Sequence, residues 1–494
     1  MAHIFTSSLI IGIAFGANKL LALVRQYAIV SRFGFGTDID AFNVANNLPD
    51  LIFSLFSGGA LAMAFIPVFA EYITGSGRDF SWKLFSKVTT LICAITLVAS
   101  AAIALLAPIL VRSSWGVAPG FDPATQALVV DLLRINLLAT IIFAVSGLVT
   151  SSLQAHKHFI LPALAPLFYN LGIIVGALVF SPLWGIYGLT WGVVLGAAMH
   201  LLIQLPALKA HAFRFSFEGS LFDPGVKKIA RLMGPRVLTV LLINITFLLR
   251  DNLASHLEAG SVTALTYGYF IMQVPETLIG TSIATALLPT LSSYASENKK
   301  KEFAQLLTIS VRAMLAGSIL PIALSFAALL PLIGTLFNFS SQESQLLVAT
   351  TNAFMIGLLA QTLLEIFVRA FYAKQNPGIP LYTTLLRAIA FAALGFSLYR
   401  QTGVVGIAAI DSFAIALQVA VLGIILLPSL RPFVSILGTA GRSIIGAGIA
   451  FGITWASVLY VPAPIIIRVS LGVLIGSAVY LRCIKREIYL IKNV

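Results

Sequence analysis

Charged residues are scarce in this sequence. Only 10% of the 494 residues are Asp, Glu, Lys or Arg, whereas 59% are hydrophobic, and soluble domains carry roughly a quarter charged residues. A water-soluble fold of this length would need a more polar surface, and a disordered, collagen-like or coiled-coil chain would need a different composition. The mean hydropathy of +0.98 therefore indicates an integral membrane protein.

Alternating polarity is also missing from the apolar segments. The strands of a membrane barrel alternate over segments of about ten residues, but the long apolar runs here, such as 91–111 and 444–460, do not alternate. Because backbone polar groups must be satisfied within the lipid, such runs form helices. The sequence predicts an all-α polytopic membrane protein.

Clusters typical of enzymes are absent as well. Cys93 and Cys483 lie far apart in the sequence, which does not indicate a disulfide framework. The run 156–158 (HKH) has no Cys or acid cluster beside it, so we predict no metal site, and no phosphate-binding glycine loop of the Walker type occurs. A membrane enzyme acting on lipid-linked sugars would need a large loop or clustered acids. We therefore expect a transporter without catalytic residues or a cofactor, and coupling to the membrane potential or to a cation stays open.

The apolar runs divide into membrane spans, each of which needs about twenty residues. By that criterion the sequence predicts about fourteen spans. The second, eighth and tenth contain Pro, Gly or polar residues, so we expect them to bend or to line a cavity. The predicted ranges are 4–30, 41–70, 84–111, 127–153, 160–180, 184–207, 229–255, 263–293, 303–333, 345–372, 379–399, 404–427, 434–460 and 463–481.

The distribution of basic residues predicts the orientation in the membrane. The net charge of +13 would suggest a nucleic-acid partner in a soluble protein. Here most basic residues lie in short loops or at span ends, where they set topology and face anionic lipid. The loops after odd-numbered spans, with their borders, hold only Arg32, Arg112, Arg400 and Arg468. The positive-inside rule therefore places both termini in the cytoplasm, and we expect no nucleic-acid partner.

Two halves of the sequence look related. In the second and eighth spans, residues 47–50 (NLPD) match residues 273–276 (QVPE). Around the fourth and tenth spans, residues 153–155 match residues 371–373, and a proline follows each at the same spacing. Both copies begin at an odd-numbered span, so they are parallel repeats. We predict an N-terminal lobe at 1–208, a basic cytoplasmic connector at 209–228, a C-terminal lobe at 229–428, and two more helices with a cytoplasmic tail at 429–494.

Charges inside the membrane point to a transport pathway between two such lobes. Lys19 and Arg25 lie in the first span without an acid within a helical turn, so we expect them to border a cavity. Arg250, followed by Asp251, takes the corresponding place in the second lobe. Cations from both lobes suit an anionic substrate, and arginine binds phosphate with two hydrogen bonds. This pattern favours a substrate with a phosphate or pyrophosphate group.

Four other arginines in the spans have simpler explanations. Two have an acid one helical turn away and can form a local ion pair. These pairs are Arg134 with Asp131 and Arg369 with Glu365. The other two, Arg312 and Arg387, lie close enough to the cytoplasmic span ends to snorkel.

Two acids complete the candidate site. Asp40 either caps the second helix or pairs with an arginine in the cavity. Glu276 lies in an apolar span, which is costly unless it is buried in protein. The candidate substrate-binding residues are Lys19, Arg25, Asp40, Arg250, Asp251 and Glu276.

Several motifs resemble those of the MurJ (MviN) lipid II flippases, a branch of the multidrug/oligosaccharidyl-lipid/polysaccharide exporter superfamily. The matching runs cover nearly the whole chain and include 18–25 (NKLLALVR), 33–42 (FGFGTDIDAF), 48–51 (LPDL), 64–72 (AFIPVFAEY) and 286–292 (ALLPTLS). The resemblance implies the same number of helices and a location in the bacterial cell membrane. It also implies alternating-access transport of lipid II to the outer leaflet, in cell-wall (peptidoglycan) biogenesis and cell shape. The lipid tail would follow a groove made by the last two helices.

The sequence departs from the family pattern at several positions that typically carry charge. These positions hold Gln26, Asn47, Phe53, Ser54, Gly58 and Phe270. Because Lys19, Arg25 and Asp40 remain, we expect recognition to rest mainly on the N-terminal lobe.

Three functions remain open at this point. The first is a monomeric flippase for lipid II, with membrane lipids as further partners. A flippase for another polyprenyl-pyrophosphate-linked glycan is the second, because charges typical of the family are missing. The third is a cation-coupled drug exporter, which would need an acidic cavity, and Lys19 and Arg25 argue against it.

Overall fold

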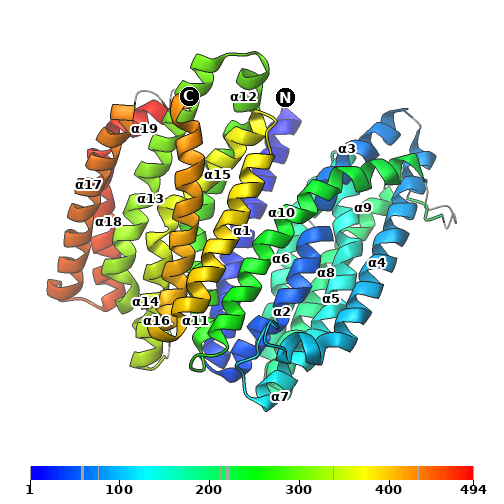
Figure 1. Cartoon of the computed structure of the whole chain (residues 1–494), viewed down its shortest axis with the longest axis horizontal. Helices are drawn as coiled ribbons and strands as arrows, with labels where there is room; N and C mark the ends of the chain where they lie inside the picture. The colour runs from blue at the N-terminus through cyan, green and yellow to red at the C-terminus, as the bar shows by residue number, and fades with distance from the viewer. Residues whose placement is uncertain are drawn as a thin grey trace. The chain divides into compact units, whose positions relative to one another are not determined.

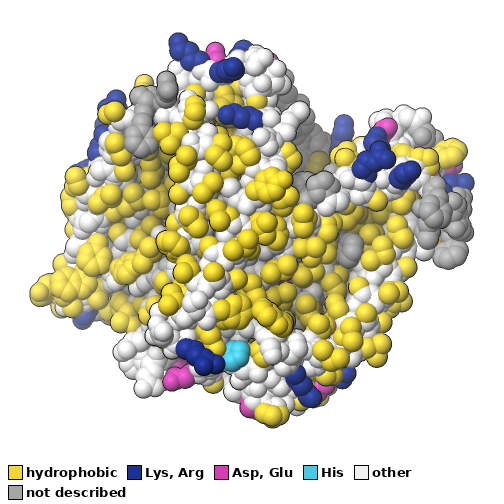
Figure 2. Space-filling view, in the orientation of Figure 1, with side chains coloured by type: hydrophobic (Ala, Val, Ile, Leu, Met, Phe, Trp, Pro, Cys, Tyr) yellow, Lys and Arg dark blue, Asp and Glu magenta, His cyan; other side chains and the backbone are white. Residues whose placement is uncertain are grey.

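The computed structural model describes residues 2–56, 60–75, 77–210, 213–216, 223–337, 339–430 and 433–492, and all its regular elements there are helices. The chain separates into two compact units, Met1–Ala259 and Gly260–Val494. Hydrophobic side chains cover the flanks of the helices, and Lys and Arg side chains gather at the helix ends (Figure 2). This distribution is the one that a lipid environment favours.

Unit 1 contains the helical elements from α1 to α10 (Figure 1). They are α1 (Ala2–Phe33), α2 (Thr37–Phe56), α3 (Ala60–Gly75), α4 (Arg78–Arg112), α5 (Pro123–Ala155), α6 (Ile160–Val175), η1 (Gly176–Phe180), α7 (Ser181–Trp184), α8 (Ile186–Leu202), α9 (Leu205–Ala210) and α10 (Pro224–Ala254), where η1 is a π-helical turn.

Unit 2 contains the remaining helices (Figure 1). They are α11 (Ser261–Glu276), the π-helical turn η2 (Thr277–Thr281), α12 (Ser282–Ser296), α13 (Lys300–Leu336), α14 (Ser341–Ile356), α15 (Leu358–Ala373), α16 (Gly378–Leu426), the 3-10 turn η3 (Leu427–Ser429), α17 (Phe433–Tyr460), α18 (Ile465–Cys483) and α19 (Lys485–Lys492).

The helices account for every predicted span. Eleven helical segments of the described residues are long and apolar enough to cross a membrane. One of them, Gly378–Ser429, contains two predicted spans, because Gly403 has φ 63° and interrupts α16. The other two predicted spans correspond to α1 and to α2 with α3. The prediction of a polytopic helical membrane protein is confirmed.

Two of the three spans predicted to bend are interrupted within the described residues. In the second span, residues 57–59 between α2 and α3 lie outside the described residues. In the eighth span, η2 follows directly after Glu276, and π-helical turns inside helices occur frequently at functional sites. The tenth span breaks at Gly357, between α14 and α15.

The internal repeat is visible in the turns of each unit. Lys157, after α5, and Gln375, after α15, both have a positive φ, of 61° and 55°. Each turn is closed in the same way, since His158 N donates to Leu153 O and Asn376 N donates to Phe371 O. Non-glycine residues seldom adopt this backbone conformation. The same rare turn at matching positions supports the repeat that the sequence pattern predicts.

Helix α10 begins earlier than predicted. The predicted seventh span starts at 229, whereas α10 starts at Pro224, and the Asp223 carboxylate caps it by accepting from Gly225 N at 2.8 Å. An N-cap Asp followed by Pro is a strong helix start, which the basic composition of the connector masked. The connector residues 211–212 and 217–222 lie outside the described residues.

The start of α10 is attached to the rest of unit 1. Asp223 accepts hydrogen bonds from Lys87 Nζ at 3.0 Å and Tyr72 OH at 3.1 Å. Burial acts to raise the pKa of Asp223, but the hydrogen bonds from Lys87, Gly225 N and Tyr72 hold that pKa below its ordinary value. Helix α10 packs against α2 and α3 and belongs to the first compact unit. The division into repeat-based lobes at 208 and 229 stays a prediction.

Aromatic side chains form much of the core of unit 1. Phe69 stacks on Phe65 with ring centroids 4.8 Å apart and lies 5.6 Å from Trp82. Close helix packing occurs between α6 and α8, where a Cβ on Gly172 would lie 2.3 Å from Gly196 Cα. Only glycine permits that approach, which brings these two helices together beside α1 and α5.

A buried ion cluster joins the C-terminal helices of unit 2. Glu487 of α19 is 1% exposed and accepts from Arg312 Nη2 at 3.2 Å, from Thr439 Oγ1 at 3.0 Å and from Arg442. Arg312 was predicted to snorkel, but the structure gives it this carboxylate partner. The cluster connects α13, α17 and α19, and α17 also packs along α13 and α18.

Replacing Glu487 with glutamine is expected to lower the melting temperature at neutral pH. Burial acts to raise the pKa of Glu487, but the hydrogen bonds from Arg442, Thr439 and Arg312 hold it below its ordinary value. The carboxylate therefore stabilises the fold above the ordinary glutamate pKa, and this contribution is lost as the pH falls through the lower folded pKa. Thermal melts in detergent across pH should show the difference between wild type and Glu487→Gln narrowing in acid. A difference that does not change with pH would contradict the assignment.

Candidate functional site

A polar cavity of about 240 Å³ lies inside unit 1, among α1, α2, α5, α6 and α8. Arg25 of α1 and Asp50 of α2 both line it, so a cation and a carboxylate face the same small space. Arg25 thus borders a cavity within this unit, whereas Lys19 does not line it, and the binding of substrate by either residue stays a prediction. Sequence reasoning did not select Asp50 as a site residue. The available signal was its place after Pro49 in an apolar span, the same place that Glu276 holds after Pro275.

Amide and aromatic groups form the rest of the cavity wall. Asn136 Nδ2 donates to Asn46 Oδ1 at 3.0 Å, which joins α5 to α2. The ring of Phe143 lies 4.7 Å from that of Phe53 and 5.0 Å from that of Tyr169, with edge-to-face geometry in both pairs. Phe53 is one of the positions where the resemblance led us to expect a charge. Here it gives the cavity an apolar wall instead.

The predicted pair Arg250–Asp251 is buried at the contact between α10 and α2. Asp251 is 1% exposed and accepts from Asn47 Nδ2 at 2.7 Å and from Arg250 Nε at 3.4 Å. The guanidinium of Arg250 also lies 4.9 Å from the ring centroid of Phe247. These contacts neutralise the pair locally and fasten α10 to α2, and neither residue lines the Arg25 cavity.

The other three predicted site residues lie apart from this cavity. Lys19 is exposed on α1, and Asp40 is buried in the first turn of α2. Glu276 is 6% exposed in unit 2, where it accepts from Thr281 Oγ1 at 3.0 Å. A Cβ on Gly280 would lie 3.0 Å from Glu276 Oε1, so the η2 turn closes over this carboxylate. Gly58, another position of missing family charge, lies outside the described residues.

Unit 2 contains a buried ion pair that the sequence did not reveal. Arg387 Nη2 donates to Asp411 Oδ1 at 3.0 Å, and the two residues are 9% and 2% exposed. Arg387 was expected to snorkel, and this expectation is wrong because a carboxylate 24 residues further along the chain neutralises it inside the bundle.

The two predicted local ion pairs are present. Arg369 pairs with Glu365 one turn away, and Arg134 lies 3.9 Å from Asp131. These arginines are therefore neutralised on their own helices, as the spacing predicted.

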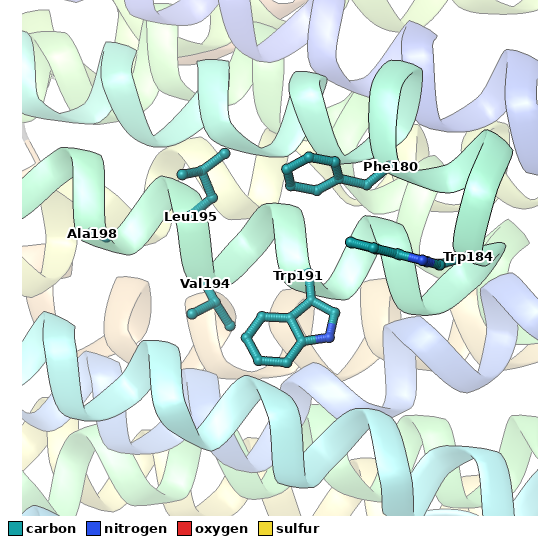
Figure 3. A pocket seen from close by; sticks show the side chains of 6 residues that line it. All are labelled: Phe180, Trp184, Trp191, Val194, Leu195 and Ala198. Atoms are coloured by element: carbon teal, nitrogen blue, oxygen red, sulfur yellow. The ribbon is translucent and has the colours of Figure 1, made fainter.

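A second cavity in unit 1 is apolar. It measures about 410 Å³ and lies against α8, between Trp191 on one side and Phe180 and Trp184 on the other (Figure 3). Aromatic and aliphatic side chains line it, and among the described residues at the cavity only the two indoles have a polar side-chain group, their N–H. Trp184 is 55% exposed and Trp191 is 41% exposed, as is typical where aromatic residues meet lipid. This cavity fits hydrocarbon and offers no cation to a phosphate.

Comparisons with known proteins place the chain in a family. The model of the family described as "Lipid II flippase MurJ" matches residues 29–476. A protein named lipid II flippase MurJ from Burkholderia cenocepacia is 30% identical over 379 residues, which is 74% of this chain and 72% of that one. A protein from Rhizobium meliloti named probable lipid II flippase MurJ is 27% identical over 80% of this chain and 76% of its own.

Solved structures agree on the fold. A structure titled lipid II flippase MurJ, inward closed conformation, has a TM-score of 0.82 at 21% identity and covers 97% of this chain and all of its own. A multidrug resistance transporter of the MATE family has a TM-score of 0.71 at 14% identity over 86% of this chain and 96% of its own. The family match spans nearly all the membrane helices of both units. The chain belongs to the MurJ family of lipid II flippases.

Proposed function

We propose that this protein is a lipid II flippase, which moves the lipid-linked peptidoglycan precursor from the cytoplasmic to the outer leaflet of the bacterial cell membrane. The observation that carries the proposal is the similarity to proteins named lipid II flippase MurJ over about three quarters of both chains. The protein is a transporter, since its membership of this family and its helical membrane fold agree.

Within this proposal, Arg25 recognises the pyrophosphate. Its guanidinium lines a polar cavity among five helices of unit 1, and such a group binds phosphate oxygens with two parallel hydrogen bonds. Lys19, six residues earlier on α1, is exposed and adds a second cation. The polyprenyl chain stays in the bilayer, where the apolar cavity beside Trp191 fits hydrocarbon. The resemblance implies a second path for it, a groove at α17 and α18.

A flippase also needs a source of energy to drive transport. We propose that transport needs no resident cofactor or metal and uses the membrane potential or a coupled cation. The presence of Arg25 and Asp50 in one cavity supports this, because a proton or other cation at the carboxylate would leave a net positive charge, which responds to the potential. The internal repeat supplies both halves of a transporter in one chain, which supports a monomer.

We expect both chain ends to face the cytoplasm. The reason is the concentration of Lys and Arg in the loops after even-numbered spans. Reporter fusions after Lys492 and in the loop near Gly334 should give opposite signals, cytoplasmic for the first and periplasmic for the second. A periplasmic signal after Lys492 would contradict the proposed orientation.

A flippase for another polyprenyl-pyrophosphate-linked glycan is the second candidate. The observation that favours it is Phe53, which lines the Arg25 cavity where the family pattern typically carries charge. The deciding experiment is complementation of a bacterial strain depleted of its own lipid II flippase. Growth supported by this chain is the expected result, and lysis despite normal membrane insertion would favour the second candidate.

A further inference from the structure

A second polar cavity lies in unit 2, at the end of the bundle that the basic residues predict to be cytoplasmic. It measures about 880 Å³ and is enclosed by the end of α12, the start of α13, the turn after α15 and the η3 turn. Figure 2 shows Lys and Arg side chains gathered over this end of the helices. None of the residues proposed for lipid II recognition lines this cavity.

The lining combines two ammonium groups with hydrogen-bond donors. Lys300 and Lys374 contribute the charge, and the Ser429 hydroxyl, which accepts from Lys374 Nζ, can donate its own proton to a ligand. Ser292 and Ser296 also line the space, but their hydroxyls donate to Leu288 O and Ser293 O. Asp and Glu are absent from the described residues that line it. The nearby acid Glu297 forms an ion pair with Lys299 at 2.6 Å and accepts a hydrogen bond from the Ser293 hydroxyl at 2.5 Å. A space with this lining attracts an anion, because charge-assisted hydrogen bonds to phosphate or carboxylate oxygens are the strongest that such donors make.

Lys374 is held in place at the cavity. Its Nζ lies 4.8 Å from the ring centroid of Phe303 and donates to Ser429 Oγ at 3.2 Å. Desolvation lowers the pKa of this ammonium from its ordinary value. Its contacts of known geometry in the described part of the chain are a ring face and a hydroxyl, and the side chain is otherwise exposed at the cavity. An incoming anion would give this ammonium a charged partner.

Two turns with a rare backbone conformation hold further polar side chains at the cavity. Asn298 has φ 56° and Gln375 has φ 55°, and both side chains line the space. The two turns are closed alike, with Lys299 N donating to Tyr294 O and Asn376 N donating to Phe371 O. Non-glycine residues in this conformation persist where the surrounding structure determines them, often at ligand sites.

We propose that this cavity binds a phosphate-bearing anion between Lys300 and Lys374. The volume lies in the range of small-molecule sites, about 300–1,000 Å³, so it accommodates more than the phosphate itself. The phosphate can belong to an anionic phospholipid headgroup at the membrane surface or to a soluble ion. Both sources share the chemistry that the two ammonium groups and the Ser429 hydroxyl recognise.

Lysine footprinting on the full-length protein in detergent tests the proposal. The protein is acetylated with and without inorganic phosphate or dihexanoyl-phosphatidylglycerol, and each lysine is quantified by mass spectrometry. Protection of Lys300 and Lys374 is expected, with Lys227, which is exposed in unit 1, unaffected. Protection by inorganic phosphate supports a soluble source, and protection by the phospholipid alone supports a headgroup. Equal protection by zwitterionic dihexanoyl-phosphatidylcholine, or protection by no probe, would overturn the proposal.

Matched variants separate this site from general surface charge. Lys374→Gln and Lys300→Gln are each expected to weaken binding of the protecting probe about ten-fold or more, since each removes a charge-assisted contact. Lys301→Gln removes an exposed neighbouring charge that does not line the cavity and should leave the affinity unchanged. If Lys301→Gln weakens binding as much as Lys300→Gln, the anion is attracted by the surface and not by the cavity. The footprint does not depend on transport, so it stands independently of the proposed flippase activity.

Discussion

Replacing Arg25 with alanine is expected to abolish complementation of a strain depleted of its lipid II flippase. The guanidinium is the cation of the polar cavity in unit 1, where it faces the carboxylate of Asp50. Each charge-assisted hydrogen bond to the pyrophosphate contributes about 1.5–3 kcal/mol, so the loss of a bidentate contact weakens binding at least about a hundred-fold. Arg25→Lys should retain part of the activity, because the charge remains while the two-pronged geometry is lost.

A control variant on the same helix shows whether the effect of Arg25→Ala is specific to the cavity. Arg32 lies in the last turn of α1, is exposed, and does not line the cavity. Arg32→Ala should therefore complement fully. Arg250→Ala should reduce transport less than Arg25→Ala, since the contacts of Arg250 with Asp251 and Phe247 place it at a packing contact. Membrane levels of each variant, measured by quantitative immunoblot, control for folding. Full growth of Arg25→Ala at normal membrane levels would show that this cavity does not recognise the substrate.

The membrane fold was predictable from the sequence because lipid imposes one strong constraint. Backbone groups must be satisfied inside each span, so the apolar runs alone located the helices. Breaks were predictable where the sequence contains Pro or Gly, as at Gly357 in the tenth span and at Pro275 in the eighth. The start of α10 was missed because the cap at Asp223 is a local signal of a few residues inside a basic segment.

The charged residues were harder to predict, because partners far apart in the sequence decide their environment. The local pair Arg369–Glu365 could be recognised from spacing on one helix. By contrast, Asp251 accepts from Asn47, which lies 204 residues away, and Glu487 accepts from Arg312, which lies 175 residues away. No periodicity within one helix reports such contacts. Asp50 could have been selected from its place after Pro49, but only tertiary packing shows that it lies at the cavity that Arg25 lines.

Replacing Asp411 with alanine is expected to destabilise unit 2 strongly. The carboxylate accepts from Arg387 Nη2 at 3.0 Å, and both residues are almost fully buried. Arg387 Nε has no hydrogen-bond partner among the described residues, so the Asp411 carboxylate is the main compensation for the buried guanidinium. Removing one partner of a buried pair costs about 3–5 kcal/mol. A large fall in the melting temperature of the purified protein in detergent is the expected result.

A double variant tests whether Arg387 and Asp411 stabilise unit 2 through their contact with each other. Arg387→Met with Asp411→Leu removes both charges and fills similar space, and such replacements of buried pairs are often neutral or stabilising. The double variant should therefore melt well above Asp411→Ala and close to wild type. If it instead melts as low as the single variant, the two side chains act through separate contacts. A transport assay on the stable double variant then tests whether the charges have a role in function. If the variant still flips substrate, the pair serves only the fold of unit 2. If flipping is lost at a normal melting temperature, the charges themselves take part in the transport cycle.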